Sequence, residues 1–62
     1  MNVHIVLHVV GEDLLLYSGS SAECPPLPRP GDEIVIRDQQ RVRIEGIRHQ
    51  YRADHLEIGL LA

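Results

Sequence analysis

The sequence has very few aromatic residues and a single cysteine. Its 62 residues include two tyrosines but no phenylalanine or tryptophan. One cysteine excludes a disulfide framework within the chain. The shortage of aromatic rings counts against nucleic-acid recognition by base stacking and against peptide binding in an aromatic-lined groove.

Long hydrophobic runs and a strong charge of one sign are also absent. No uninterrupted apolar run approaches the roughly 20 residues that a membrane-spanning helix needs. Nine acidic residues and six basic residues, all arginine, give a net charge of −3, which disfavours nucleic-acid binding driven by bulk charge. The hydrophobic content of 44% predicts a folded chain. We expect a cytoplasmic protein that does not bind membranes, because a reducing compartment suits a lone thiol.

Alternating apolar residues predict an all-β domain. Residues 3–10 alternate as a strand, residues 14–18 return as a second strand, and residues 11–13 form the turn between them. Residues 19–31 contain all four prolines, which excludes a helix and predicts an extended, polyproline-like crossover. Residues 32–60 resume the alternation as a three-stranded meander.

The middle strand of the meander is predicted to contain a β-bulge. Ile44 points inward, but the alternation changes phase at Gly46, so one extra residue at Glu45–Gly46 is needed to return Ile47 to the same face. Short bent strands in about 60 residues close most economically into a small barrel. The predicted fold is a single all-β domain over residues 1–62, a small five-stranded SH3-like barrel or roll. An incomplete OB-like barrel or open roll is the alternative.

The start of the meander resembles a motif of other small β proteins. Residues 27–34, Leu-Pro-Arg-Pro-Gly-Asp-Glu-Ile, are similar to the Pro-Arg-x-Gly-Asp-x-hydrophobic segment of small bacterial and phage-type β proteins. The step from Val42 to Ile47 is similar to the Val-x-x-Val step of these proteins, and the resemblance covers about residues 14–60. It implies a compact β domain of bacterial or phage-like origin, without an assigned activity.

The first predicted strand carries apolar residues on both faces. Its second face presents His4, Val6, His8 and Val10, and Leu15 from the second strand lies beside them. A domain this small buries only about 60% of its unfolded surface and often gains stability by oligomerisation. An exposed apolar strip typically marks an interface. We therefore predict a non-enzymatic interaction or accessory protein that forms a homodimer through this strip and has a possible further protein partner. The alternative is that the proline-rich crossover covers this face.

The arginines support a rival hypothesis, an RNA- or DNA-binding small β-barrel with an arginine-rich outer face. Arginine is well suited to phosphate recognition. Acidic residues are interleaved on the same strands, so cross-strand ion pairs are the simpler interpretation. The arginines are Arg37, Arg41, Arg43 and Arg48, and the acids are Glu33, Asp38, Glu45 and Glu57.

The four histidines are predicted to be exposed or half-buried. His4 and His8 share a strand face, but their spacing of roughly 13 Å is too great for one metal ion. His49 and His55 are expected to approach each other across the last hairpin, beside Glu57. A weak metal site or a pH-sensitive contact is the alternative there.

Cys24 and the prolines are predicted to be structural. Cys24 lies beside Glu23, whose charge opposes thiolate formation, so a spectator thiol is favoured over a nucleophile. Pro25 to Pro28 resemble a ligand for WW-type domains, but a stiff connector is the simpler interpretation. No Ser-His-Asp or paired-carboxylate arrangement is recognisable. The sequence therefore predicts no enzyme, no cofactor and no metal site.

Overall fold

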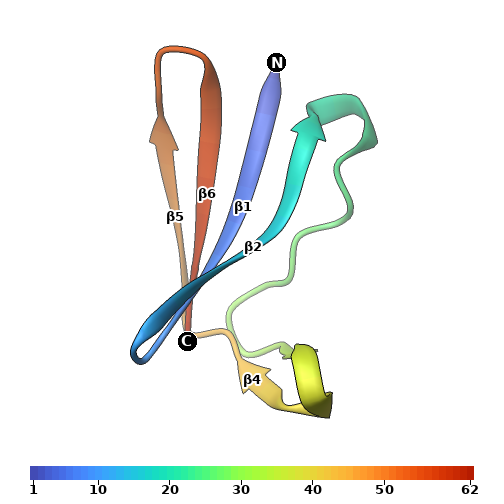
Figure 1. Ribbon diagram of the computed structural model, residues 1–62, viewed down its shortest axis with the longest axis vertical. Helices are drawn as coiled ribbons and strands as arrows, with labels where there is room; N and C mark the ends of the chain where they lie inside the picture. The colour runs from blue at the N-terminus through green and yellow to red at the C-terminus, as the bar shows by residue number, and fades with distance from the viewer.

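The chain folds as two antiparallel hairpins and a small two-stranded sheet (Figure 1). The computed structural model describes residues 1–37 and 39–62 with their side chains. The elements are β1 (Asn2–Val9), β2 (Glu12–Ser20), η1 (Ser21–Glu23), β3 (Glu33–Val35), η2 (Arg37–Gln39), β4 (Arg41–Arg43), β5 (Gly46–Tyr51) and β6 (His55–Leu61). A four-stranded sheet has the order β2-β1-β6-β5, and β3 pairs with β4. The prediction of an all-β fold is confirmed.

Helical structure in the described part of the chain is limited to η1 and η2. Each is a 3₁₀ turn of three residues. Neither has the length or the apolar character to cross a membrane.

The first hairpin contains a bulge that the alternation does not reveal. Its register pairs Ile5 with Tyr17 and then Val6 with Leu15, which leaves Leu16 as an extra residue on β2. An extra residue bends its strand and increases the local twist. Leu14, Leu15 and Leu16 therefore do not simply alternate between the two faces.

The first and last strands pair in parallel at the centre of the large sheet (Figure 1). The register places Val3 beside Leu56 and Leu7 beside Leu60. Both strands carry aliphatic residues at alternate positions, so their pairing creates one continuous apolar face. This inner face supplies most of the core.

The predicted meander is divided between the two sheets. β4 pairs with β3, whereas β5 pairs with β6, and the chain passes from one sheet to the other at Ile44 and Glu45. The Glu45 N–H donates to the Leu61 carbonyl at 2.7 Å, and Gly46 is also the registered partner of Leu61. The alternation therefore changes phase where the chain changes sheet, and β4 and β5 are separate strands instead of the one bulged strand that was predicted. The division gives six strands instead of five, and the sheets form an open, SH3-like roll without closing into a barrel.

The core is aliphatic and lies between the two sheets. Leu7, Ile44 and Leu60 are its most deeply buried side chains, each at most 1% exposed. Ile44 lies on the segment that joins the sheets, so its burial holds the small sheet against the large one. The buried set is Val3, Ile5, Leu7, Val42, Ile44, Ile58 and Leu60.

The proline-rich crossover runs back along the large sheet from η1 to the small sheet (Figure 1). Leu27 packs against the buried core, and residues 25–28 share a pocket with Ile5 and Leu60 of the inner face. The crossover therefore covers the inner face, and the alternative that it covers the outer face is wrong. Leu27 contributes apolar surface to the core, whereas Pro25 and Pro26 are exposed.

The crossover ends in a tight turn before β3. Gly31 has a φ of 97°, a left-handed conformation that glycine adopts without steric cost. The Asp32 carboxylate accepts a hydrogen bond from the Arg29 N–H at 2.9 Å, and the Asp32 N–H donates to the Arg29 carbonyl. This explains why Gly-Asp precedes the strand in the sequence.

Candidate functional site

The outer face of the large sheet carries the residues of the predicted interface. Alternation along β1 turns His4, Val6 and His8 away from the core, and all three are half-buried. Val6 lies opposite Leu15 of β2, whose side chain is 62% exposed. Val10 is fully exposed in the hairpin turn at the end of this row. Because Val10 lies in the turn, we call the other four predicted interface residues, His4, Val6, His8 and Leu15, the outer strip.

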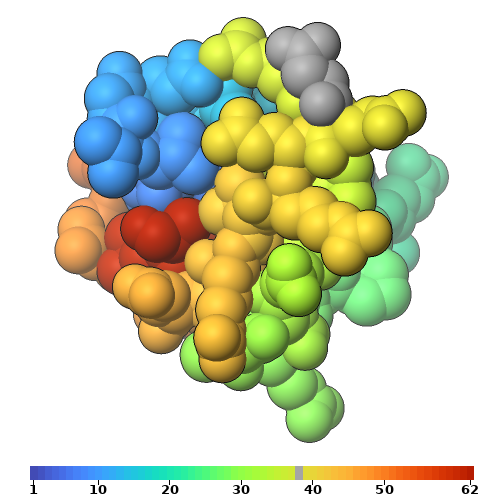
Figure 2. All heavy atoms as spheres, turned by 90° about the horizontal axis from the view of Figure 1, so that it is seen from below, coloured from blue at the N-terminus to red at the C-terminus, as the bar shows by residue number. Residues whose placement is uncertain are grey.

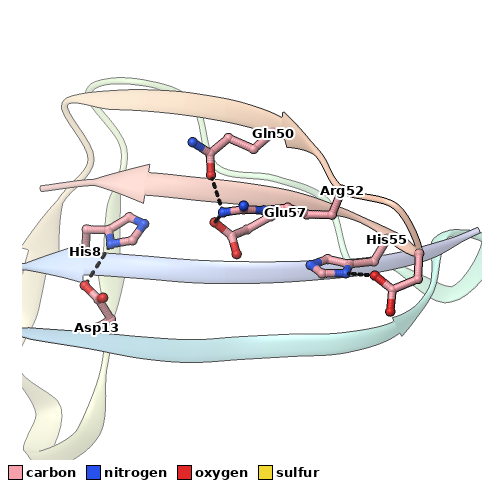
Figure 3. Close-up of polar contacts among 7 residues, drawn as sticks. His8, Asp13, Gln50, Arg52, His55 and Glu57 are labelled. Atoms are coloured by element: carbon pink, nitrogen blue, oxygen red, sulfur yellow. Dashed lines mark hydrogen bonds and ion pairs between the residues drawn. The ribbon is translucent and has the colours of Figure 1, made fainter.

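One end of the outer strip is held by a His–Asp contact. His8 Nδ1 lies 2.8 Å from Asp13 Oδ1 across the hairpin (Figure 3). The His8 ring also lies over Gly59 of β6, where an added Cβ would come within 3.1 Å of His8 Nε2. Glycine at this position lets the imidazole lie close to the sheet, so the orientation of His8 is set by two neighbouring strands.

The other end of the outer strip contains a stacked histidine pair. The rings of His4 and His55 have centroids 4.0 Å apart and planes inclined by 19°. His55 Nδ1 lies 2.8 Å from Asp54 Oδ1. This hydrogen bond, together with the charge of His55, lowers the pKa of Asp54 below its ordinary value.

The prediction that His49 approaches His55 is wrong. The β5–β6 register places His49 opposite Ile58, a residue of the inner face. His55 is an odd number of positions from Ile58 along β6, so its side chain projects from the outer face. The parallel pairing of β1 and β6 brings His55 to His4 instead.

A third polar group crosses β5 and β6 on the same outer face (Figure 3). Gln50 and Glu57 are registered partners, and the Arg52 guanidinium reaches both. Arg52 Nη2 donates to Gln50 Oε1 at 3.0 Å and lies 3.6 Å from Glu57 Oε2. The outer face therefore has an apolar centre at Val6 with polar contacts around it.

Arg37 is engaged in an ion pair. Its Nη2 donates to both carboxylate oxygens of Glu12, at 2.5 and 2.6 Å. Glu12 begins β2, so this contact joins the first hairpin to η2 beside the small sheet. The positive charge of Arg37 is therefore compensated locally.

The other predicted arginines lie on two different sheets. Arg41 and Arg43 flank the buried Val42 on β4 and project away from the core. Arg48 belongs to β5 and lies beside Gly59 on the outer face of the large sheet. The predicted interleaved acid Asp38 lies outside the described residues. Arg41 and Arg43 are two positions apart on the same strand, so the nucleic-acid hypothesis rests first on these two.

The histidines, Cys24 and the acidic residues form no metal site in the part of the chain that the structure describes. Within residues 1–37 and 39–62, no three histidine, cysteine, aspartate or glutamate side chains are close enough to hold a metal ion together. Half-buried Cys24 donates weakly to the Pro25 carbonyl at 3.5 Å. Desolvation raises the pKa of Tyr17, and the nearby charges of Cys24 and Glu23 raise it further.

Comparison with protein-family models, curated proteins and solved structures gives no match for this chain. The resemblance of residues 27–34 to small bacterial and phage-type proteins therefore stays a prediction.

Some residues of the outer face were not foreseen as neighbours of the outer strip. His55, Glu57 and Gly59 reach it only because β6 pairs in parallel with β1. Arg52 and Gln50 follow through the last hairpin. The signal for this pairing is the matched apolar alternation of the first and last strands. That match does not by itself distinguish a parallel partner from an antiparallel one.

Proposed function

We propose that this chain is a small, non-enzymatic interaction protein that self-associates through the outer strip. The observation that carries the proposal is the Val6–Leu15 pair, which lies on the outer face while the crossover and the small sheet pack against the inner face. In the monomer these two side chains stay more exposed to water than the core side chains do. Burying them against a partner would add hydrophobic stabilisation to the dimer.

A second copy of the chain is the partner that fits best. The strip crosses β1 and β2, and β2 is an edge strand of the large sheet. Two copies related by a two-fold axis bring the same exposed leucine of each chain to the centre of an isologous contact. An interface of standard size takes about 800 Å² from each partner, and this chain exposes 4512 Å² in all.

The polar contacts around the strip suit the rim of such an interface. Protein interfaces typically have an apolar centre and a polar, partly hydrated rim. His8 with Asp13 lies at one end of the strip, and His4 with His55 lies at the other. His8 and His55 already contact the carboxylates of Asp13 and Asp54, so self-association does not leave these two rings without a hydrogen bond.

Sedimentation equilibrium over a wide concentration range tests the proposal. We expect a monomer–dimer equilibrium that Leu15→Glu weakens at least about tenfold, because a carboxylate in the apolar centre must be desolvated. Val35→Glu is the matched control: Val35 is 65% exposed, close to the 62% of Leu15, but lies on the small sheet. Circular dichroism checks that both variants fold. A strict monomer at high concentration, or equal weakening by Val35→Glu, contradicts the proposal.

A further inference from the structure

An open pocket lies at the end of the molecule where the turn of the first hairpin meets the small sheet. Figure 2 looks onto this end, with the first hairpin in blue, the last residues in red and β4 in yellow. The pocket has a volume of about 340 Å³. Its apolar lining comes from Val9, Val10, Ile36, Val42 and Ala62. These residues belong to four separate segments, so the pocket exists only in the folded chain.

The size of this pocket distinguishes it from the cavity beneath the crossover. Small-molecule sites usually enclose roughly 300 to 1,000 Å³. The crossover cavity, lined by residues 25–28 and Tyr17, has only about 210 Å³. The pocket at the hairpin turn is therefore the better candidate for a ligand.

Two arginines give the pocket a positive rim. Arg41 and Arg43 both line it, and both are exposed on β4 on either side of Val42. The registered partner of Arg41 on β3 is the apolar Val35, and that of Arg43 is Glu33. Guanidinium groups at the edge of an apolar surface favour an anion that also has an apolar part.

The acidic residue that lines the pocket is already engaged. Glu12 accepts both of its hydrogen bonds from Arg37 at 2.5 and 2.6 Å. Its negative charge is therefore largely compensated by Arg37, which limits its repulsion of an anion bound at Arg41.

We propose that this pocket binds a small amphipathic anion. The apolar body of the ligand lies on the valine and isoleucine side chains, and one anionic head group accepts hydrogen bonds from Arg41 and Arg43. The described lining contains no aromatic residue, so stacking of a nucleobase gains little there. The site is separate from the outer strip and does not depend on self-association.

Titration with anilinonaphthalene sulfonate, followed by fluorescence and by amide-resolved NMR, tests the proposal. We expect saturable binding with the largest amide shifts at Val9, Val10 and Val42. Two matched probes separate the parts of the ligand. Phenylnaphthylamine has the apolar body without the charge, and inorganic sulfate has the charge without the body. Each should bind at least about tenfold more weakly, since each loses one of the two interactions.

Substitutions then identify the head-group contacts. Arg41→Gln and Arg43→Gln should each weaken binding of anilinonaphthalene sulfonate by about tenfold, the usual effect of losing a charge-assisted hydrogen bond. Arg48→Gln is the matched control, because Arg48 is exposed on the other sheet. It should leave the affinity unchanged.

Several outcomes overturn the proposal. Equal binding of phenylnaphthylamine indicates a purely apolar site, and equal binding of sulfate indicates a simple anion site. Shifts centred on Leu16 and Tyr17 assign the probe to the crossover cavity. Displacement of the probe by a short oligonucleotide of higher affinity, lost in the variant with Arg41→Glu and Arg43→Glu, favours the nucleic-acid hypothesis instead.

Discussion

The inner and outer faces of the large sheet come from alternate residues of the same strands but differ in character. On β1, Ile5 and Leu7 are at most 3% exposed, whereas Val6 and His8, which alternate with them, are half-buried. Both faces contain apolar residues, so composition alone does not decide which face is covered. The path of the chain after β2 decides it, because the crossover packs on the inner face.

The two faces also differ in how they contribute to stability. The inner face buries aliphatic side chains, whose transfer from water is the main driving force of folding. The outer face is held by polar contacts such as His8–Asp13 and Arg52–Glu57, whose members are exposed or half-buried. Such contacts each contribute little, because water and salt screen them.

The largest expected difference is between two leucine-to-alanine substitutions, one on each face of the sheet. Leu7→Ala should lower the free energy of unfolding by about 3 kcal/mol, because it leaves a cavity at a fully buried position. Leu15→Ala should change it by less than about 0.5 kcal/mol in the monomer. Urea unfolding followed by circular dichroism, at concentrations where the chain is monomeric, measures both. Equal losses would show that the outer face is covered in the monomer.

A smaller effect is expected where the outer face is most closely packed. Gly59→Ala should cost about 1 kcal/mol, because the new Cβ would force the His8 ring to move. The same substitution in a His8→Ala background should be nearly neutral. A double-mutant cycle of unfolding free energies measures this coupling. If Gly59→Ala costs the same in both backgrounds, His8 does not lie over Gly59 in solution.

The polar group on the last hairpin should contribute less again. Arg52→Gln removes the contact to Glu57 at 3.6 Å and the hydrogen bond to Gln50. We expect a loss below about 0.5 kcal/mol, because the Arg52 side chain is 52% exposed. Raising the salt concentration should reduce the difference between variant and natural chain. A loss as large as that of Leu7→Ala would mean that this group is structural.

The smallest expected effect is confined to acid pH. The pKa of Asp54 is lowered from its ordinary value of 3.8 by the hydrogen bond and charge of His55. A lowered folded-state pKa stabilises the fold above about pH 3.8 and loses that contribution as the pH falls through the folded-state value. Asp54→Asn should therefore flatten the decline in stability as the pH falls below about 3.8. Urea midpoints across this range check it.

Glu45→Gln is the control for that titration, since it removes the same charge at the opposite end of β5. We expect this control variant to lose stability in acid as steeply as the natural chain does. If Asp54→Asn leaves the curve unchanged, the contact between Asp54 and His55 does not persist in solution.

Local sequence signals predicted much of the fold. The break in the alternation at Gly46 marks the point where the chain passes to the large sheet, and Gly31 with Asp32 indicated the turn before β3. The division of the meander was not predictable, because alternation shows which side of a strand is apolar but not which sheet it joins. The bulge at Leu16 in the first hairpin was not predicted for a related reason. In a run of three leucines, the alternation does not show which residue is the extra one.

The candidate site was predicted only in part. His4, Val6, His8 and Leu15 were placed together correctly, because neighbours within a hairpin follow from its register. The stacking of His4 on His55 depends on pairing between the two ends of the chain. Such long-range pairing is set by the competition among all strands, which no local pattern reports.

The parallel pairing of β1 with β6 also constrains when the chain is able to fold during its synthesis. β1 is made before the other strands, but its central partner β6, which includes Leu60 and Leu61, is the last strand of the sheet to be made. Until β6 leaves the ribosome, the first hairpin presents the open backbone edge of β1 and its apolar inner face to other chains. Contacts this distant in sequence also form slowly. Aggregation is therefore most expected during synthesis, while the first hairpin has formed but β6 has not yet paired with it.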